Sequence, residues 1–237
     1  RNEVLLAIAA TLDSNREEIK RINQKDMEAG KKNGLTEALL DRLLLTDTRI
    51  DGMIQGIREV VAMEDKIGHI ENMVKRPNGL LIGQMNVPLG TIAIIYESRP
   101  NVTIDAAVLC VKAGNTILLR GGSEAIYSNV YLTELMQTAA YAEGFPEGGI
   151  DIIRNTGHDL VDELVQQRDY VDVLIPRGGA NFINHIVSIA KVPVIETGAG
   201  NCHTYVDKLA NLEMAVEIAF NGKVQRPSVC NATKKLL

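Results

Sequence analysis

The chain has 237 residues, of which 46% are hydrophobic and 23% charged, and its formal net charge is −5. These values are ordinary for a globular protein with a sizeable core, and they do not favour a nucleic-acid or acidic-membrane surface. No apolar run approaches the roughly 20 residues of a membrane span. Three cysteines without a C-x-x-C spacing, and scattered histidines, disfavour a disulfide framework or a metal site. The composition therefore predicts a reduced, cytoplasmic protein.

Helices are predicted for residues 2–65. Apolar residues recur there at spacings of three and four, as in Leu5, Ile8 and Leu12. Asp47 is the predicted cap of the last of these helices. The stretch 71–96 changes to strand character, with turns at 77–79 and 88–90, and predicts a strand pair.

Apolar strands alternate with amphipathic helices beyond residue 90. The predicted strands are 91–97, 115–120, 149–154, 170–176 and 192–196, and the predicted helices between them are 102–114, 123–144, 159–167 and 180–191. This alternation predicts an α/β fold with a Rossmann-like parallel sheet covered by helices on both faces. Ligands of such sheets bind beyond the carboxyl ends of the strands, which here are the loops 97–101, 120–123, 176–179 and 197–201.

Two of these loops begin with Arg-Gly-Gly. The first consists of Arg120, Gly121, Gly122 and Ser123, and the second of Arg177, Gly178 and Gly179. Glycines let a backbone approach a ligand closely, and the helix that follows offers free N–H groups. The loops therefore indicate an anion or phosphate site, with ordinary tight turns as the alternative. The sequence "TGAGN" lacks the third glycine of the dinucleotide fingerprint.

Asn101 follows Pro100 at the end of the first strand of the alternating region, and it has two interpretations. Its side chain caps the next helix, or its amide donates to a developing oxyanion.

The three cysteines stand in different settings. Cys110 lies in an apolar helical run and is predicted to be core. Cys202 adjoins His203, but neighbouring side chains of an extended segment point to opposite faces, which disfavours a catalytic pair. Cys230 follows a proline turn, where a helix N-terminus or Arg226 would favour its thiolate. Cys230 is therefore the candidate nucleophile.

The chain resembles the γ-glutamyl phosphate reductases, a family of the aldehyde dehydrogenase superfamily, in the segments "IIYESRPNVTIDAAVLCVKAGNTILLRGGSEA", "VLIPRGG", "VPVIETGAGNCHTYVD" and "QRPSVCNA". The resemblance implies an aldehyde-dehydrogenase-like fold. Residues 1–197 would form an NADP-binding domain from the N-terminal helices, the strand pair 71–96 and a Rossmann-like core 90–197. Residues 198–237 would begin a second α/β catalytic domain, truncated relative to the family.

The resemblance also implies a reaction, the second step of proline biosynthesis. L-glutamyl 5-phosphate is reduced with NADPH to L-glutamate 5-semialdehyde, and phosphate is released. In this interpretation the Cys230 thiolate forms a thioester with the substrate, and Asn101 helps to stabilise the oxyanion.

The cofactor residues come from the same resemblance. Arg120 falls where many relatives carry a lysine that faces the cofactor ribose. Ser123 falls where NAD-preferring relatives carry a glutamate, so its presence favours NADPH. Glu196 matches a general-base glutamate whose hydrolytic role has no use in a reductase, so Glu196 would shape the cofactor pocket together with Thr197 and Gly198.

Two arginines are candidates for substrate contacts, and partners are also expected. Arg99 and Arg226 are candidates for binding the α-carboxylate of the substrate, with phosphate or backbone carbonyls as the alternative. A homo-oligomer and association with glutamate 5-kinase are expected. Because the family continues well beyond the cysteine, two alternatives stay open: a non-catalytic nucleotide-binding or assembly fragment, and the reductase half of a bifunctional kinase–reductase.

Overall fold

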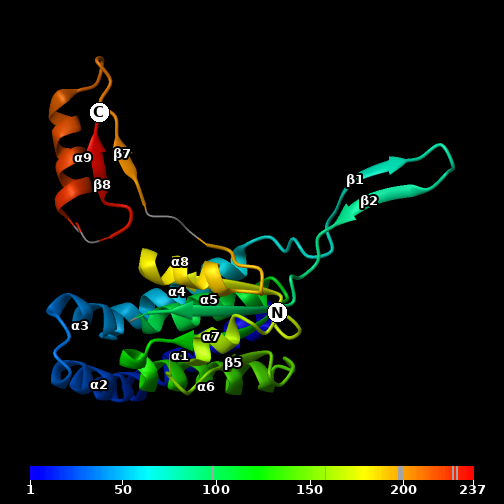
Figure 1. The fold of residues 1–237 in the computed structure, drawn as a ribbon, viewed down its shortest axis with the longest axis horizontal. Coiled ribbons are helices and arrows are strands. Elements are labelled where there is room, and N and C mark those ends of the chain that lie inside the picture. Colours follow the sequence, from blue (N-terminus) through cyan, green and yellow to red (C-terminus); the bar gives the residue numbers. More distant parts are fainter. Residues whose placement is uncertain (98, 158, 197–199, 226, 228) are drawn as a thin grey trace. The chain divides into compact units, whose positions relative to one another are not determined.

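The computed structural model describes residues 1–97, 99–157, 159–196, 200–225, 227 and 229–237. The chain divides into two compact units, Arg1–Glu196 and Thr197–Leu237, and each is described by itself. Figure 1 shows the elements of both units. Among the described residues, none of the helices combines the length and the apolarity that crossing a bilayer requires.

The predicted N-terminal helices are confirmed. They are α1 (Asn2–Ser14), α2 (Arg16–Lys32), α3 (Glu37–Leu43) and α4 (Asp47–Ala62). The apolar face of α1 is buried through Leu5, Ile8 and Leu12, as its spacing predicts. The prediction that Asp47 caps α4 is wrong, because the Thr46 hydroxyl accepts from the Arg49 N–H and Asp47 is already the first helical residue.

A hairpin of exposed residues follows the N-terminal helices. It consists of β1 (Ile70–Lys75) and β2 (Leu81–Met85), which are antiparallel. The predicted turn at 77–79 is confirmed, since the Arg76 N–H donates to the Leu80 carbonyl across it. The strand pair is shorter than the predicted 71–96, because residues from Thr91 onward join a different sheet.

The central sheet of the first unit is parallel. Its strands are β3 (Thr91–Tyr96), β4 (Thr116–Gly121), β5 (Ile150–Ile152) and β6 (Val173–Arg177), in the order β5-β4-β3-β6. The predicted strand 192–196 forms only a bridge between Val194 and Leu174. Pro193 has no N–H to donate, which limits that ladder.

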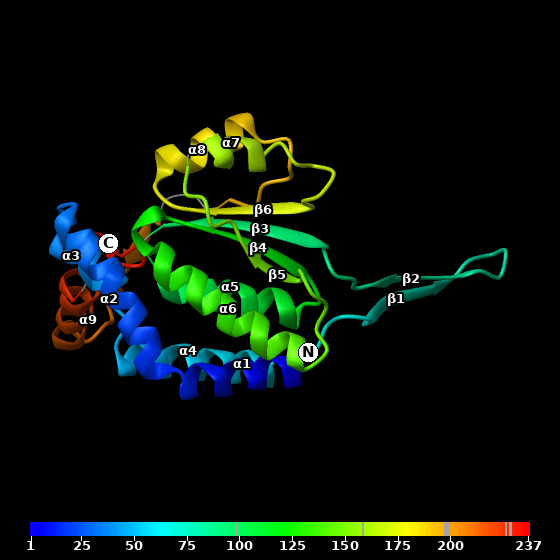
Figure 2. The ribbon, with the colours of Figure 1, turned by 90° about the horizontal axis from the view of Figure 1, so that it is seen from below.

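Helices cover both faces of this sheet, as predicted. They are α5 (Pro100–Lys112), η1 (Ser123–Ala125), α6 (Ile126–Ala142), α7 (Asp159–Leu164) and α8 (Ala180–Ile189). Figure 2 shows α5 and α6 on one face, with α1 and α4 beyond them, and α7 and α8 on the other. Successive residues of β3 point to opposite faces of the sheet. Ile92 and Ile94 belong to the core on the α5–α6 side. Ala93 and Ile95 belong to the core on the α7–α8 side. The α/β fold class is confirmed.

The second unit is a single β-α-β arrangement. Its elements are β7 (Cys202–Thr204), α9 (Leu212–Val224) and β8 (Thr233–Leu236), and β7 and β8 are parallel. The Asn211 side chain caps α9 by accepting from the Met214 N–H. None of the described residues of α9 is buried, and Val216 and Phe220 are exposed.

Candidate functional site

Three neighbouring strands have their carboxyl ends side by side at the same edge of the sheet. Tyr96, the last residue of β3, is in register with Gly121 of β4 and with Arg177 of β6. The structure therefore brings the two Arg-Gly-Gly sequences to opposite sides of the β3 end. This arrangement is the one that parallel α/β sheets use for ligand binding.

Arg120 lies within β4, and its side chain turns into the protein instead of into the loop. Only 6% of the residue is exposed. Its guanidinium donates to the carbonyl of Gly121 at 3.1 Å, to that of Thr156 at 2.7 Å and to that of Gly157 at 3.3 Å. Burial lowers the pKa of Arg120, and the nearby Glu124 carboxylate opposes this effect. The side chain thus holds the segment that follows β5.

Gly121 and Gly122 are buried. A Cβ on Gly121 would stand 2.1 Å from the amide nitrogen of the fully buried Asn129, which explains the glycine at this position. A Cβ on Gly122 would stand 2.3 Å from a Glu124 carboxylate oxygen, the end of a flexible side chain that can move aside. Ser123 follows them at the start of η1 and is exposed. The loop is therefore a fixed backbone with one exposed hydroxyl.

A buried polar chain lies behind these strand ends. The Tyr96 hydroxyl is 2.7 Å from the Thr103 hydroxyl, which donates to the side-chain amide oxygen of Asn129 at 3.0 Å. All three side chains are almost completely buried. Tyr96, Thr103 and Asn129 thereby join β3 to the first turns of α5 and α6. The sequence did not predict these hydrogen bonds. Their only sequence signal was a polar residue inside each apolar helical face.

A second buried cluster fixes the start of α6. The Asp26 carboxylate accepts from the backbone N–H groups of Tyr127 and Ser128 and from the Ser128 hydroxyl. The Asn23 amide donates to the Ser128 hydroxyl and to the Leu43 carbonyl. A side chain of α2 therefore provides the cap for the N-terminus of α6, which follows the Ser123 loop directly.

The other Arg-Gly-Gly sequence leads into α8. Arg177 ends β6 and is exposed. Gly178 packs against Glu97 and Phe182, whereas no atom of the described residues lies within 4 Å of the place where a Cβ on Gly179 would stand. Gly179 is the N-cap of α8, and no side chain of the described residues caps this helix. The start of α8 is therefore open to an anion.

Asn101 is the second residue of α5, so the capping interpretation is wrong. The N-cap is Arg99, because Pro100 already has a helical conformation and favours the first helical position. The Asn101 amide nitrogen donates instead to the Asp105 carboxylate at 3.0 Å. A carboxylate only accepts hydrogen bonds, so this contact fixes which end of the amide is the nitrogen.

Some predicted site residues lie at or outside the limits of the described structure. Glu196 is exposed at the end of the first unit. Thr197, Gly198 and Arg226 lie outside the described residues, and their proposed roles stay predictions. The substrate-binding role of Arg99 also stays a prediction.

Cys230 is exposed in a turn of the second unit, between α9 and β8. The Ala232 N–H donates to the Val229 carbonyl across this turn. The Cys202 sulfur lies 3.5 Å from the Cys230 carbonyl oxygen. His203 instead contacts the Asn201 side chain, so the two neighbours Cys202 and His203 have different partners, as predicted.

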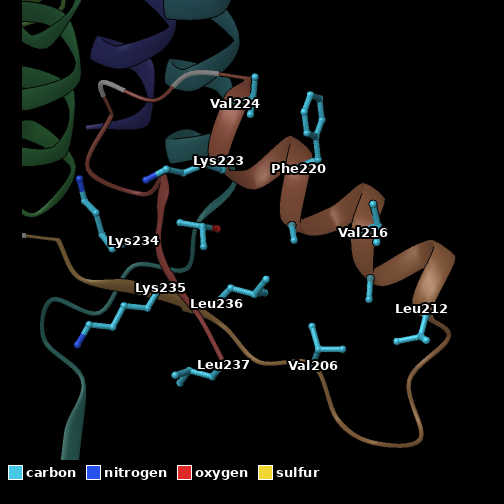
Figure 3. A pocket seen from close by; sticks show the side chains of 13 residues that line it. Val206, Leu212, Val216, Phe220, Lys223, Val224, Lys234, Lys235, Leu236 and Leu237 are labelled. Atoms are coloured by element: carbon cyan, nitrogen blue, oxygen red, sulfur yellow. The ribbon is translucent and has the colours of Figure 1, made fainter.

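An apolar groove lies between α9 and β8 in the second unit (Figure 3). Its volume is about 730 Å³, and Val216 and Phe220 contribute apolar side chains to it. Lys234 and Lys235 are the basic residues of its strand side. In the described part of the chain, no cluster of three or more His, Cys, Asp or Glu side chains is placed to hold a metal ion.

Comparison with known proteins gives a family for the whole chain. The model of the "Aldehyde dehydrogenase family" matches residues 1–237. A γ-glutamyl phosphate reductase of Clostridium novyi is 55% identical over 237 residues, and one of Moorella thermoacetica is 56% identical. Each match covers 100% of this chain and 57% of the relative, so the chain spans little more than half the length of these proteins.

Solved structures agree with this family. A γ-glutamyl phosphate reductase of Thermotoga maritima has a TM-score of 0.92 at 44% identity, with 99% of this chain and 57% of that chain covered. The Saccharomyces cerevisiae enzyme of the same name has a TM-score of 0.77 at 29% identity, covering 100% of this chain and 59% of that one. A probable aldehyde dehydrogenase of Listeria monocytogenes shares the fold. Its TM-score is 0.69 at 20% identity, with 99% of this chain and 49% of that chain covered.

Proposed function

The chain belongs to the aldehyde dehydrogenase family, and from this membership we propose that it supplies the cofactor site and the nucleophile of a γ-glutamyl phosphate reductase. The reaction is the NADPH-dependent reduction of L-glutamyl 5-phosphate to L-glutamate 5-semialdehyde, with release of phosphate, in proline biosynthesis. The observation that carries the proposal is the 55% identity to a reductase of this name over all 237 residues.

The carboxyl edge of the sheet fits a nicotinamide dinucleotide. The N-terminus of α8 at Gly179 is suited to a pyrophosphate, because no described side chain caps its first N–H groups. Gly178 and Gly179 would hold the pyrophosphate, and Gly121 to Ser123 would hold the adenosine ribose. When bound, the cofactor supplies the hydride of the reduction.

The residues of the chain have separate tasks in this mechanism. The Cys230 thiolate attacks the acyl carbon, the bond from that carbon to the phosphate oxygen breaks, and a thioester on Cys230 results. An amide nitrogen carries two hydrogens, so Asn101 can donate one to Asp105 and the other to the oxyanion. Asp105 thus keeps the donor end of Asn101 in one orientation.

NADPH is proposed as the cofactor on the basis of Ser123. In NAD-preferring relatives this position often carries a glutamate, which would repel a 2′-phosphate. The exposed Ser123 lacks that charge. Arg120 does not add to this argument, because its guanidinium is buried and donates to backbone carbonyls.

The cofactor preference is tested by Ser123→Glu. The added carboxylate should weaken NADPH binding much more than NADH binding, measured by fluorescence titration with each cofactor. Ser123→Gln adds a side chain of similar size without charge and serves as the control. Equal affinity of the unmutated protein for both cofactors would contradict the proposed preference.

The nucleophile is tested by Cys230→Ser in an enzyme of the relatives' full length that carries this sequence. Turnover of glutamate 5-semialdehyde, NADP and phosphate in the reverse direction should be abolished, while NADPH binding stays largely intact because the cofactor loops are unchanged. Cys202→Ser is the matched control and should retain substantial activity. The reverse ranking of the two variants would show that Cys230 is not the nucleophile.

A further inference from the structure

Two cysteines that are 28 residues apart in the sequence meet in the second unit. Cys202 begins β7 and is in register with Thr233 of β8. The turn before β8 places Cys230 next to Cys202, and the Cys202 thiol donates to the Cys230 carbonyl oxygen at 3.5 Å. The sulfur of Cys202 therefore lies directly against the residue that carries the proposed nucleophile.

Close backbone packing holds the two segments in this arrangement. A Cβ on Gly200 would stand 2.2 Å from the Cys230 carbonyl oxygen and 3.3 Å from the Cys230 Cβ. Real Cβ atoms do not approach an oxygen so closely, so position 200 needs a glycine for the turn to lie where it does. The contact between Cys202 and Cys230 is thus part of the packing of β7 against the turn.

The accessibility of the cysteines separates this pair from the third one. Cys230 is exposed and Cys202 is partly buried. Cys110 is buried in α5, and burial raises its pKa to about 12. Because the thiolate is the reactive form, Cys110 is protected from oxidation while the pair is open to it.

We propose that Cys202 is the resolving thiol for oxidation of Cys230, so that the pair forms a reversible disulfide under peroxide. A peroxide oxidises the Cys230 thiol to a sulfenic acid and is itself reduced to water. The Cys202 thiol then attacks the sulfenic sulfur, a second water leaves, and a disulfide bond joins the two residues. A dithiol reductant restores both thiols by exchange.

A disulfide bridge needs the two Cα atoms roughly 4.4–6.8 Å apart. The contact between the Cys202 sulfur and the Cys230 carbonyl oxygen already brings the two residues together. Rotation of both side chains about their Cα–Cβ bonds would turn the two sulfurs toward each other. The consequence is protection of Cys230 from irreversible oxidation to the sulfinic acid.

This inference goes beyond the proposed function, and its test needs no turnover. The chain of residues 1–237 is treated with hydrogen peroxide, quenched with a thiol-blocking reagent and digested for mass spectrometry without reduction. We expect a linked pair of peptides that contain Cys202 and Cys230, with the loss of two hydrogens, and full recovery of both thiols after treatment with dithiothreitol. Cys110 should stay reduced in the same sample.

Cys202→Ser is the decisive variant, because serine keeps a donor for the Cys230 carbonyl and preserves the fold. In this variant Cys230 should gain two oxygens and should not recover with dithiothreitol. Cys110→Ser is the control and should behave like the unmutated chain. The proposal is overturned if Cys230 reaches the sulfinic acid equally fast with and without Cys202, or if the linked peptides come only from two different chains.

Discussion

The buried guanidinium of Arg120 connects the ends of two strands. It lies in β4, yet it donates to the carbonyls of Thr156 and Gly157 beyond β5. Hydrogen bonds of a charged donor contribute roughly 1.5–3 kcal/mol each. Arg120 is therefore expected to act on the cofactor site indirectly, by fixing the backbone beside it.

Arg120→Lys tests this positioning role. Lysine keeps the charge, but a single ammonium group cannot reproduce the fork of donors. We expect the affinities for NADPH and NADH to fall by the same factor, together with a loss in unfolding free energy of about 1.5–3 kcal/mol. Fluorescence titration and denaturant unfolding measure the two effects. A loss confined to NADPH would mean that Arg120 binds the 2′-phosphate directly.

Asp26 gives the unfolding free energy a pH dependence. Burial raises the pKa of its carboxyl above the ordinary value of 3.8, and the donors of Ser128 and Tyr127 oppose this. The folded state thus binds the proton more tightly than the unfolded state. The stabilisation from the protonated form is complete below pH 3.8 and is lost as the pH rises through the raised pKa.

Asp26→Asn removes this titration. We compare the unfolding free energy of the unmutated chain with that of the variant. The advantage of the unmutated chain should shrink as the pH rises above 3.8, by about 1.4 kcal/mol for each unit of the pKa shift, and then become constant. Thermal unfolding of both proteins from acidic to neutral pH measures it. An advantage that grows with pH would mean that the folded state favours the charged carboxylate.

The two glycine loops differ in what surrounds their glycines. Gly121 sits where β4, α6 and the Tyr96 ring converge, and a Cβ there would clash with Asn129. Gly179 sits at the start of α8, where a Cβ would meet no atom of the described part of the chain within 4 Å. Both glycines come from the same sequence pattern, but one serves packing and the other leaves room for a ligand.

Gly121→Ala and Gly179→Ala are a matched pair that separates these roles. Gly121→Ala should destabilise the protein by roughly 1–3 kcal/mol, the usual cost of overpacking. Gly179→Ala should leave the unfolding free energy nearly unchanged and weaken cofactor binding, because its methyl group occupies the open space before α8. Denaturant unfolding and cofactor titration are measured on both variants. Loss of stability in Gly179→Ala with intact binding would contradict the proposed pyrophosphate site.

Sequence patterns predicted the elements better than they predicted the partners of polar side chains. Alternating apolar strands gave the parallel sheet, because each strand is buried on both faces. The cap supplied by Asp26 to α6 was not predictable, since about 100 residues separate the partners and nothing local marks them. For Asn101 the local cap signal was misleading, because Pro100 starts α5 one residue earlier. The direction of the Arg120 side chain depends on tertiary packing alone.

The residues proposed for catalysis and cofactor binding come from both units. Asn101 and the cofactor loops belong to the first unit, and Cys230 belongs to the second. The relatives are longer, since this chain spans 57% of their length. A protein limited to residues 1–237 is therefore expected to bind NADPH weakly and to show no turnover in the reverse reaction. Near-normal turnover by residues 1–237 would show that this stretch alone completes the site.

Large apolar side chains are exposed in both units. The β1–β2 hairpin exposes Leu81 and Ile82, and the groove of the second unit exposes Val216 and Phe220. Exposed apolar patches of this kind mark surfaces for association. Within the described residues, β1 and β2 pair only with each other, so the hairpin also presents free strand edges. The homo-oligomer stays a prediction, and this hairpin is the surface expected to form it.

Leu81→Lys and Phe220→Lys compare the two surfaces. Leu81 is 67% exposed and Phe220 is 66% exposed, so neither substitution removes a buried contact within the chain. We expect residues 1–237 to self-associate, and we expect Leu81→Lys to lower this association more than Phe220→Lys, because the hairpin offers strand edges in addition to apolar side chains. Sedimentation velocity over a range of protein concentrations measures the effect. A chain that stays monomeric at every concentration, or a larger effect of Phe220→Lys, would contradict the assignment of the hairpin as the association surface.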